Sequence, residues 1–140
     1  MTMAIIQEDE VSQQRLKQAF ESHNIEVMCD GDTGVLINGG NEQELMVWFD
    51  DRDKLLTLCV VLMPHEEADA MQERDLYTMT SEFNTMFEIG TFDVKNPIGL
   101  ILRYVLTYRG GVMESAIVDS ARRIQVVATG ALGVVRRFKK

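Results

Sequence analysis

The chain has 140 residues, with 22 acidic and 14 basic side chains, a net charge of -8 and 46% apolar residues. That length and composition predict a single globular domain and exclude a disordered chain. The acidity argues against nucleic-acid binding, because phosphate contacts require a basic surface. No apolar run approaches the roughly 20 residues needed to cross a bilayer, so we expect no membrane span.

The first half of the chain predicts a leader, a helix and a group of strands. Residues 1–10, which end in the polar run Gln7-Glu8-Asp9-Glu10, predict a flexible leader to one domain over residues 11–140. Apolar residues recur at helical spacing over residues 11–23, with Ser12 or Asp9 as the N-cap. Turn sequences rich in Asp, Asn and Gly then separate four expected strands, at residues 25–29, 35–37, 44–49 and 54–62.

The second half predicts two more helices around a pair of strands. Helical spacing covers residues 66–86 and 113–138, and strands are expected at 87–94 and 100–109. The order α-β-β-β-β-α-β-β-α predicts an α+β fold, with helices packed on one antiparallel sheet. The strand at 54–62 is apolar on both faces, which indicates that both of its faces are covered.

The sequence contains no recognisable catalytic or cofactor motif. Neither a phosphate-binding loop nor a nucleophile elbow is found. The histidines are His23 and His65 and the cysteines are Cys29 and Cys59, too few and too scattered for a closed zinc site. We therefore predict a non-enzymatic protein without catalytic residues, metal or cofactor, although a pocket that holds His65 with two carboxylates would favour an enzyme.

The cysteines and the N-terminus indicate a cellular location. We interpret Cys29 and Cys59 as small buried side chains that remain reduced. The N-terminus lacks the basic start and apolar core of a signal peptide. Together these features predict a cytoplasmic protein.

Two predicted strands supply candidate partner-binding residues. Trp48 and Phe49 are adjacent, so they point to opposite faces of a strand that also carries Met46. In the strand at 100–109, the alternation places Arg103, Val105 and Arg109 on one face. We expect the helices to cover one face of the sheet; if its other face lacks a helix, another chain must cover that face. The predicted partner-binding set is Met46, Trp48, Phe49, Arg103, Val105 and Arg109.

The last five residues, Arg136-Arg137-Phe138-Lys139-Lys140, differ in charge from the rest of the chain. Without them the sequence has 10 basic against 22 acidic residues, a charge of -12. Cations at the end of a helix offset the negative end of its dipole. A contact with anionic lipid or nucleic acid is the alternative interpretation.

The pattern resembles the YbjN family of small bacterial proteins, labelled sensory transduction regulators, whose fold is similar to class I type III secretion chaperones. The resemblance covers residues 11–128 and lies in four features: the hairpin at 44–56, the helical segment at 76–87 with Asn84, the strand pair at 87–94 and 100–107, and the closing helix. It implies a non-enzymatic homodimer that binds another protein, and it brings no active-site residues.

Two functional hypotheses follow. The first is a homodimer that holds a client or regulatory protein, with residues 100–109 or the closing helix as the dimer interface. The second is a small-ligand sensor, with a pocket between sheet and helices lined by Tyr104, Tyr108 and methionines.

Overall fold

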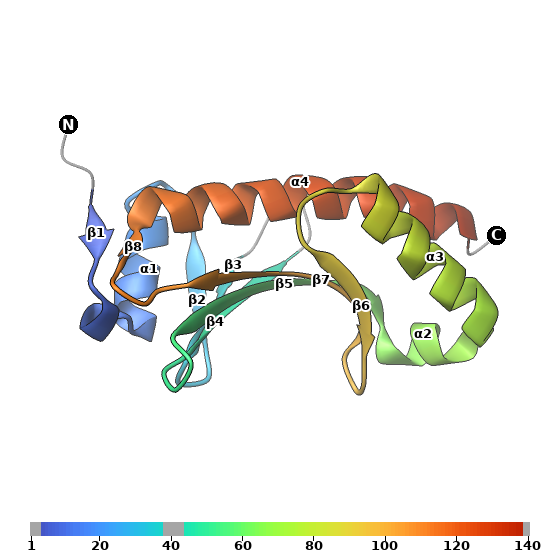
Figure 1. The fold of residues 1–140 in the computed structure, drawn as a ribbon, viewed down its shortest axis with the longest axis horizontal. Coiled ribbons are helices and arrows are strands. Elements are labelled where there is room, and N and C mark those ends of the chain that lie inside the picture. Colours follow the sequence, from blue (N-terminus) through green and yellow to red (C-terminus); the bar gives the residue numbers. More distant parts are fainter. Residues whose placement is uncertain (1–3, 38–43, 139–140) are drawn as a thin grey trace.

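The computed structural model describes residues 4–37 and 44–138, and it contains one six-stranded antiparallel sheet in the order β2-β3-β4-β5-β7-β6 (Figure 1). A second, two-stranded sheet joins β1 to β8. The elements are β1 (Ile5–Ile6), η1 (Glu8–Glu10), α1 (Gln13–Glu21), β2 (Val27–Asp30), β3 (Gly34–Ile37), β4 (Leu45–Asp50), β5 (Leu55–Pro64), α2 (His65–Ala70), α3 (Glu73–Met86), β6 (Thr91–Lys95), β7 (Gly99–Thr107), β8 (Val112–Met113) and α4 (Glu114–Phe138).

The predicted α+β architecture, an antiparallel sheet with helices packed on it, is confirmed, with differences in its details. Ser12 caps α1 by accepting a hydrogen bond from the Arg15 amide at 3.1 Å. The helix expected over 66–86 is two helices, because Met71 and Gln72 adopt extended backbone conformations between α2 and α3. This break lets the chain turn from the end of β5 to a position beside β6.

The expectation of a flexible leader over residues 1–10 does not fit residues 4–10. Ile5 and Ile6 pair with Met113 and Val112 to form the small sheet, and the Ile6 side chain is fully buried. The Glu8 carboxylate accepts a hydrogen bond from the Gly110 amide at 2.9 Å. Apolar burial and strand pairing therefore attach this segment to the domain.

The hydrophobic core lies between one face of the sheet and the helices. Every second residue of β5, from Leu56 to Leu62, is buried against this core, which α4 supplies with side chains such as Ile117 and Ile124. Figure 1 shows α4 running along the whole sheet, with α1 beside its start and α3 beside its later turns. Each fully buried Leu or Ile contributes about 1.5–3 kcal/mol.

A buried carboxylate fixes α1 to the start of α4. Glu114, the first residue of α4, accepts hydrogen bonds from the Ser22 hydroxyl at 2.7 Å and from Arg15 Nη2 at 3.0 Å. His23 Nδ1 lies 3.6 Å from the same carboxylate. Burial raises the pKa of Glu114, but these hydrogen bonds and the charges of Arg15 and His23 outweigh that effect and hold the pKa below its ordinary value.

We expect Glu114→Gln to lower the free energy of unfolding at pH 7 by about 1–3 kcal/mol, since it removes hydrogen bonds to a charged acceptor. A carboxyl whose pKa is lower in the folded state stabilises the fold above its unfolded pKa, and that contribution is lost as the pH falls through the folded pKa. The difference between variant and wild type should therefore shrink below about pH 4.5, the ordinary pKa of a glutamate. Urea unfolding between pH 7 and pH 3 measures it.

Asp119→Asn is the control, because Asp119 is an exposed acid of the same helix. It should change stability by less than about 0.5 kcal/mol at either pH. An equal effect of Glu114→Gln at pH 7 and pH 3 would show that the charge of Glu114 does not matter.

Candidate protein-binding face

The face of the large sheet turned away from α4 has its own set of side chains, which we call the open face. One row of directly paired residues crosses five strands: Met28, Leu36, Met46, Cys59 and Arg103. A second row contains Trp48, Thr57 and Val105. None of these residues belongs to the core cluster beneath the helices.

Apolar side chains of the open face are partly exposed to solvent. Met28 is 49% exposed and Val105 is 42% exposed, while Leu36, Met46 and Trp48 are half-buried. Cys59 is fully buried because its neighbours on the same face shield it. Figure 1 shows the sheet arching beneath α4, so that the open face is its concave side. The described part of the chain places no helix across this face.

The structure brings together four of the six predicted partner-binding residues. Met46 and Arg103 both pair with Cys59 on β5, whereas Trp48 and Val105 both pair with Thr57. All four therefore lie within two adjacent rows of the open face.

The other two predicted residues lie elsewhere. Phe49 pairs with Leu56 and packs on the core, because adjacent strand residues point to opposite faces. Arg109 is exposed in the turn after β7. The sequence prediction also missed Met28 and Leu36, since their place beside Met46 depends on the pairing of β2, β3 and β4.

The side chain of Arg103 has unused hydrogen-bonding capacity. Its Nη2 atom lies 3.9 Å from the Asp93 carboxylate, a long ion pair. Its Nε atom is buried and has no hydrogen-bond partner in the described structure. A pocket of about 350 Å³ adjoins it, lined by Gly90, Thr91, Arg103, Tyr104 and Val105. Arg103 is thus placed to donate a hydrogen bond to a further oxygen atom at this point.

One edge of the sheet is capped by a side chain. The Asn84 amide donates to the Phe92 carbonyl at 3.0 Å, and its oxygen accepts from the Phe92 amide at 2.9 Å. The next outward amide on β6, that of Val94, donates to the Asp93 carboxylate at 2.9 Å. These contacts occupy the groups by which an exposed edge strand recruits another chain.

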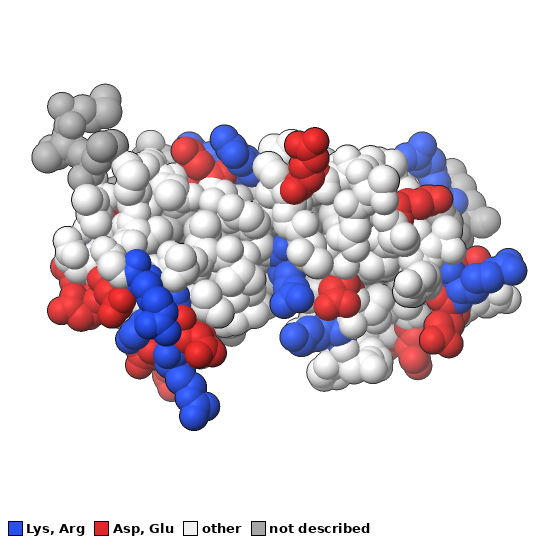
Figure 2. Space-filling view, in the orientation of Figure 1, with Lys and Arg blue, Asp and Glu red and all other residues white. Residues whose placement is uncertain are grey.

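The edge of β7 beyond β6 is uncapped. Because Phe92 points its main-chain groups toward Asn84, the alternation of an antiparallel pair directs those of Thr91 toward β7. By the same alternation, the amides and carbonyls of Val105 and Thr107 point to the side of β7 on which β6 lies. They extend beyond the first residue of β6, so no strand lies opposite them. The described residues offer these groups no partner. Charged side chains are sparse over this part of β7 in Figure 2.

The cysteines differ in exposure, and the prediction that both are buried is wrong for Cys29. Cys29 is exposed at the sheet edge, on the opposite face from Cys59, and both thiols are free. Burial raises the pKa of Cys59 to about 11, although the charges of Arg103 and Lys95 act in the other direction.

One pocket, of about 320 Å³ beside α2, holds His65 with two carboxylates, those of Asp69 and Glu73, which is the arrangement that would favour an enzyme. The described structure contains no hydrogen bond or salt bridge among them, whereas a catalytic base requires hydrogen-bond reach. Among the described residues, no three His, Cys, Asp or Glu side chains could hold a metal ion together.

The two tyrosines proposed to line a ligand pocket differ in their surroundings. Tyr108 is 1% exposed and donates its hydroxyl to the Asp50 carbonyl at 3.1 Å, so it belongs to the packed interior. Tyr104 packs partly against the same core and also lines the pocket beside Arg103. The small-ligand sensor stays a prediction.

Among the described helices, none is long and apolar enough to cross a membrane.

The comparisons with known proteins show a shared fold. No family model matches the chain, and no curated protein matches its sequence. The crystal structure of YbjN from E. coli, described as a candidate transcription regulator, superposes with a TM-score of 0.64 at 11% sequence identity. The match covers 90% of this chain and 92% of YbjN. At that identity the likeness establishes the fold, and the resemblance stated from sequence is confirmed to that extent.

We expect one thiol of the native protein to react rapidly with a disulfide reagent at pH 7.5. Cys29 is exposed, whereas Cys59 is buried and its pKa of about 11 leaves fewer than about one thiol in a thousand ionised. Colorimetric titration should therefore count a second equivalent only in guanidinium chloride. Cys29→Ser should abolish the rapid phase, and Cys59→Ser should leave it unchanged. Two rapid equivalents in the native protein would contradict the burial of Cys59.

Proposed function

We propose that this protein is a non-enzymatic protein-binding module that acts as a homodimer and holds a client or regulatory protein. The observation that supports it most strongly is the open face, where Met28, Leu36, Met46, Trp48 and Val105 remain without helical cover. Contiguous apolar surface of this kind marks interaction sites in soluble proteins. The fold shared with YbjN, itself described as a candidate regulator, is consistent with a regulatory partner.

The β7 side of the open face is suited to a second copy of the chain. Of the charged side chains described at open-face positions, Asp50 and Asp93 are balanced by Lys95 and Arg103, although the whole chain has a charge of -8. Two copies that meet here avoid the repulsion between acidic surfaces. The unpaired edge of β7 lies alongside, and a two-fold axis presents the same groups from both copies.

The opposite side of the open face remains for the client. Met28, Leu36 and Met46 lie on β2, β3 and β4, away from β7. Methionine side chains are flexible and adapt to different apolar surfaces. We infer that this side binds an apolar segment of the client, while β7 faces the second copy.

The proposed dimer predicts that Val105→Asp yields monomers. Burying a carboxylate in an apolar interface costs several kcal/mol, so the dissociation constant should rise by about a hundredfold or more. Size-exclusion chromatography with light scattering at micromolar concentration measures the mass. Val126→Asp is the matched control, because Val126 is 69% exposed on α4 and distant from the open face.

The outcomes of this experiment separate the alternatives. A monomeric wild type would overturn the homodimer. A dimer lost in Val126→Asp and retained in Val105→Asp would place the interface on α4 instead.

The proposed client site predicts that Met28→Glu loses a bound protein that the wild type retains. A charge in the centre of an apolar contact opposes binding, while dimerisation through β7 should persist. Affinity capture from the native cell followed by mass spectrometry compares the two proteins. Met86→Glu is the control, since Met86 is 59% exposed on α3 and outside the open face. Identical captured proteins for all three chains would contradict the client site.

A further inference from the structure

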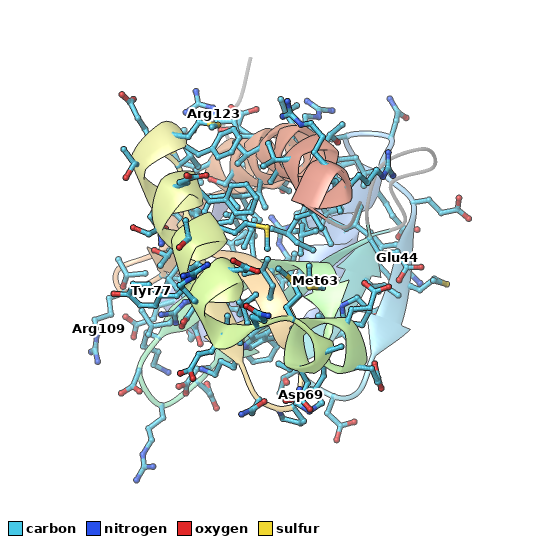
Figure 3. The ribbon with its side chains drawn as sticks, turned by 90° about the vertical axis from the view of Figure 1, so that its right-hand side faces the viewer. Glu44, Met63, Asp69, Tyr77, Arg109 and Arg123 are labelled. Atoms are coloured by element: carbon cyan, nitrogen blue, oxygen red, sulfur yellow. The ribbon has the colours of Figure 1, made fainter. Side chains whose placement is uncertain are left out.

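A groove runs between α2, α3 and β6, at the end of the molecule opposite β1. It consists of two adjoining pockets of about 320 and 290 Å³, which share Glu73, Leu76 and Val94 in their lining. Figure 3 faces this end, with Asp69 on α2 below and Tyr77 on α3 at one side. We call these two pockets together the α3–β6 groove. The groove adjoins the open face at Asp93, which lies at the border of both surfaces.

The floor of the groove is apolar and incompletely covered. Leu76 and Met71 are half-buried there, and Val94 is 40% exposed. Tyr77, at the margin, is 77% exposed. Tyrosine is among the side chains enriched at the energetically dominant positions of protein interfaces, where a partner buries it. A ligand for this groove therefore needs an apolar side chain.

The rim of the groove is acidic. Asp69, Glu73 and Asp93 line it, and neither pocket is lined by any Lys or Arg. Neither Asp69 nor Glu73 forms a salt bridge with another described residue. Over residues 65–86 the chain has six acidic residues and one basic residue. This concentration of negative charge selects a basic partner.

The chain itself contains a segment with this chemistry. Residues 136–140 place Phe138 between two arginines and two lysines, and residues 120–140 include six basic residues and no acidic one. Arg136 and Arg137, in the last turn of α4, are exposed and form no salt bridge with described residues. The segment combines the positive charge and the apolar side chain that the groove requires.

We propose that residues 136–140 of one copy dock in the α3–β6 groove of a second copy. The basic side chains meet the acidic rim, and Phe138 enters between Leu76, Tyr77 and Val94. Repeated about a two-fold axis, the contact closes a dimer with two identical tail–groove pairs. The inference rests on the proposed homodimer only in taking a second copy as the partner, since it uses neither the apolar side chains of the open face nor β7.

The first experiment adds the segment in trans. A fluorescein-labelled peptide of residues 132–140 is titrated with the full-length protein, and its anisotropy is recorded. We expect saturable binding that weakens when the salt concentration rises from about 50 to about 500 mM, because screening reduces the attraction between exposed charges. The labelled peptide with Phe138→Ser should bind more weakly at both salt concentrations.

Charge reversals on one helix provide matched variants of the protein. Glu73→Lys should weaken peptide binding by about tenfold, which corresponds to about 1.4 kcal/mol. Glu82→Lys makes the same charge change at an exposed position of α3 outside the groove, and should weaken it by less than about twofold. If Glu73→Lys fails to fold, Tyr77→Ala replaces it, because that side chain is largely exposed.

Several results would overturn the proposal. The proposal would be wrong if the peptide did not bind at millimolar protein concentration. It would also be wrong if Glu73→Lys and Glu82→Lys lowered the affinity for the peptide equally, because that result indicates unspecific attraction between charges. Preference of the peptide for anionic vesicles or duplex DNA, with no effect of Glu73→Lys, would assign the segment to lipid or nucleic acid instead.

The full-length chain distinguishes this inference from the proposed dimer face. Arg136→Glu with Arg137→Glu should lower the apparent mass in light scattering at a fixed concentration, and added Glu73→Lys should lower it no further. A mass that changes with Val105→Asp and not with the double variant would refute tail docking while leaving the dimer through β7. A double variant whose mass is unchanged, in a protein whose groove still binds the peptide, would place the tail in the groove of its own chain.

Discussion

The packing of α4 along one face of the six-stranded sheet is the contact on which the rest of the structure depends. It buries the side of β5 formed by Leu56, Leu58, Val60 and Leu62. Because strand residues alternate, burying that side presents Leu55, Thr57, Cys59 and Val61 on the other. The helices α1 and α3 extend the same layer over β2, β3 and β6. The apolar pattern of β5 on both faces therefore creates a core and an open face at once.

Strand alternation made part of this arrangement predictable. The pattern of residues 100–109 placed Arg103 and Val105 on one face, and the adjacency of Trp48 and Phe49 placed them on opposite faces. Periodicity also predicted α1 and α4 closely, because each presents an apolar stripe to the sheet. These features are local, so a single sequence contains them.

Features that depend on pairing between distant segments were not predictable. Met28 lies beside Leu36 and Met46 only because β2 pairs with β3 and β3 with β4. The burial of Ile6 requires β8, more than a hundred residues later in the chain. The break at Met71 and Gln72 depends on where α3 must lie relative to β6, and the local helical pattern continues through it.

Hydrogen bonding and charge determine which parts of the surface around β6 and β7 can bind another chain. Asn84 and Asp93 occupy outward main-chain groups of β6, which opposes the recruitment of another chain by that strand. The longer β7 extends past β6, so the main-chain groups of Val105 and Thr107 on that side have no neighbouring strand. The α3–β6 groove combines an apolar floor with an acidic rim, so a partner that approaches it must carry positive charge. On the open face the described charges balance, so like surfaces can approach. A chain of charge -8 can therefore associate with itself only where its charge is locally cancelled, and both proposed contacts satisfy that condition by different means.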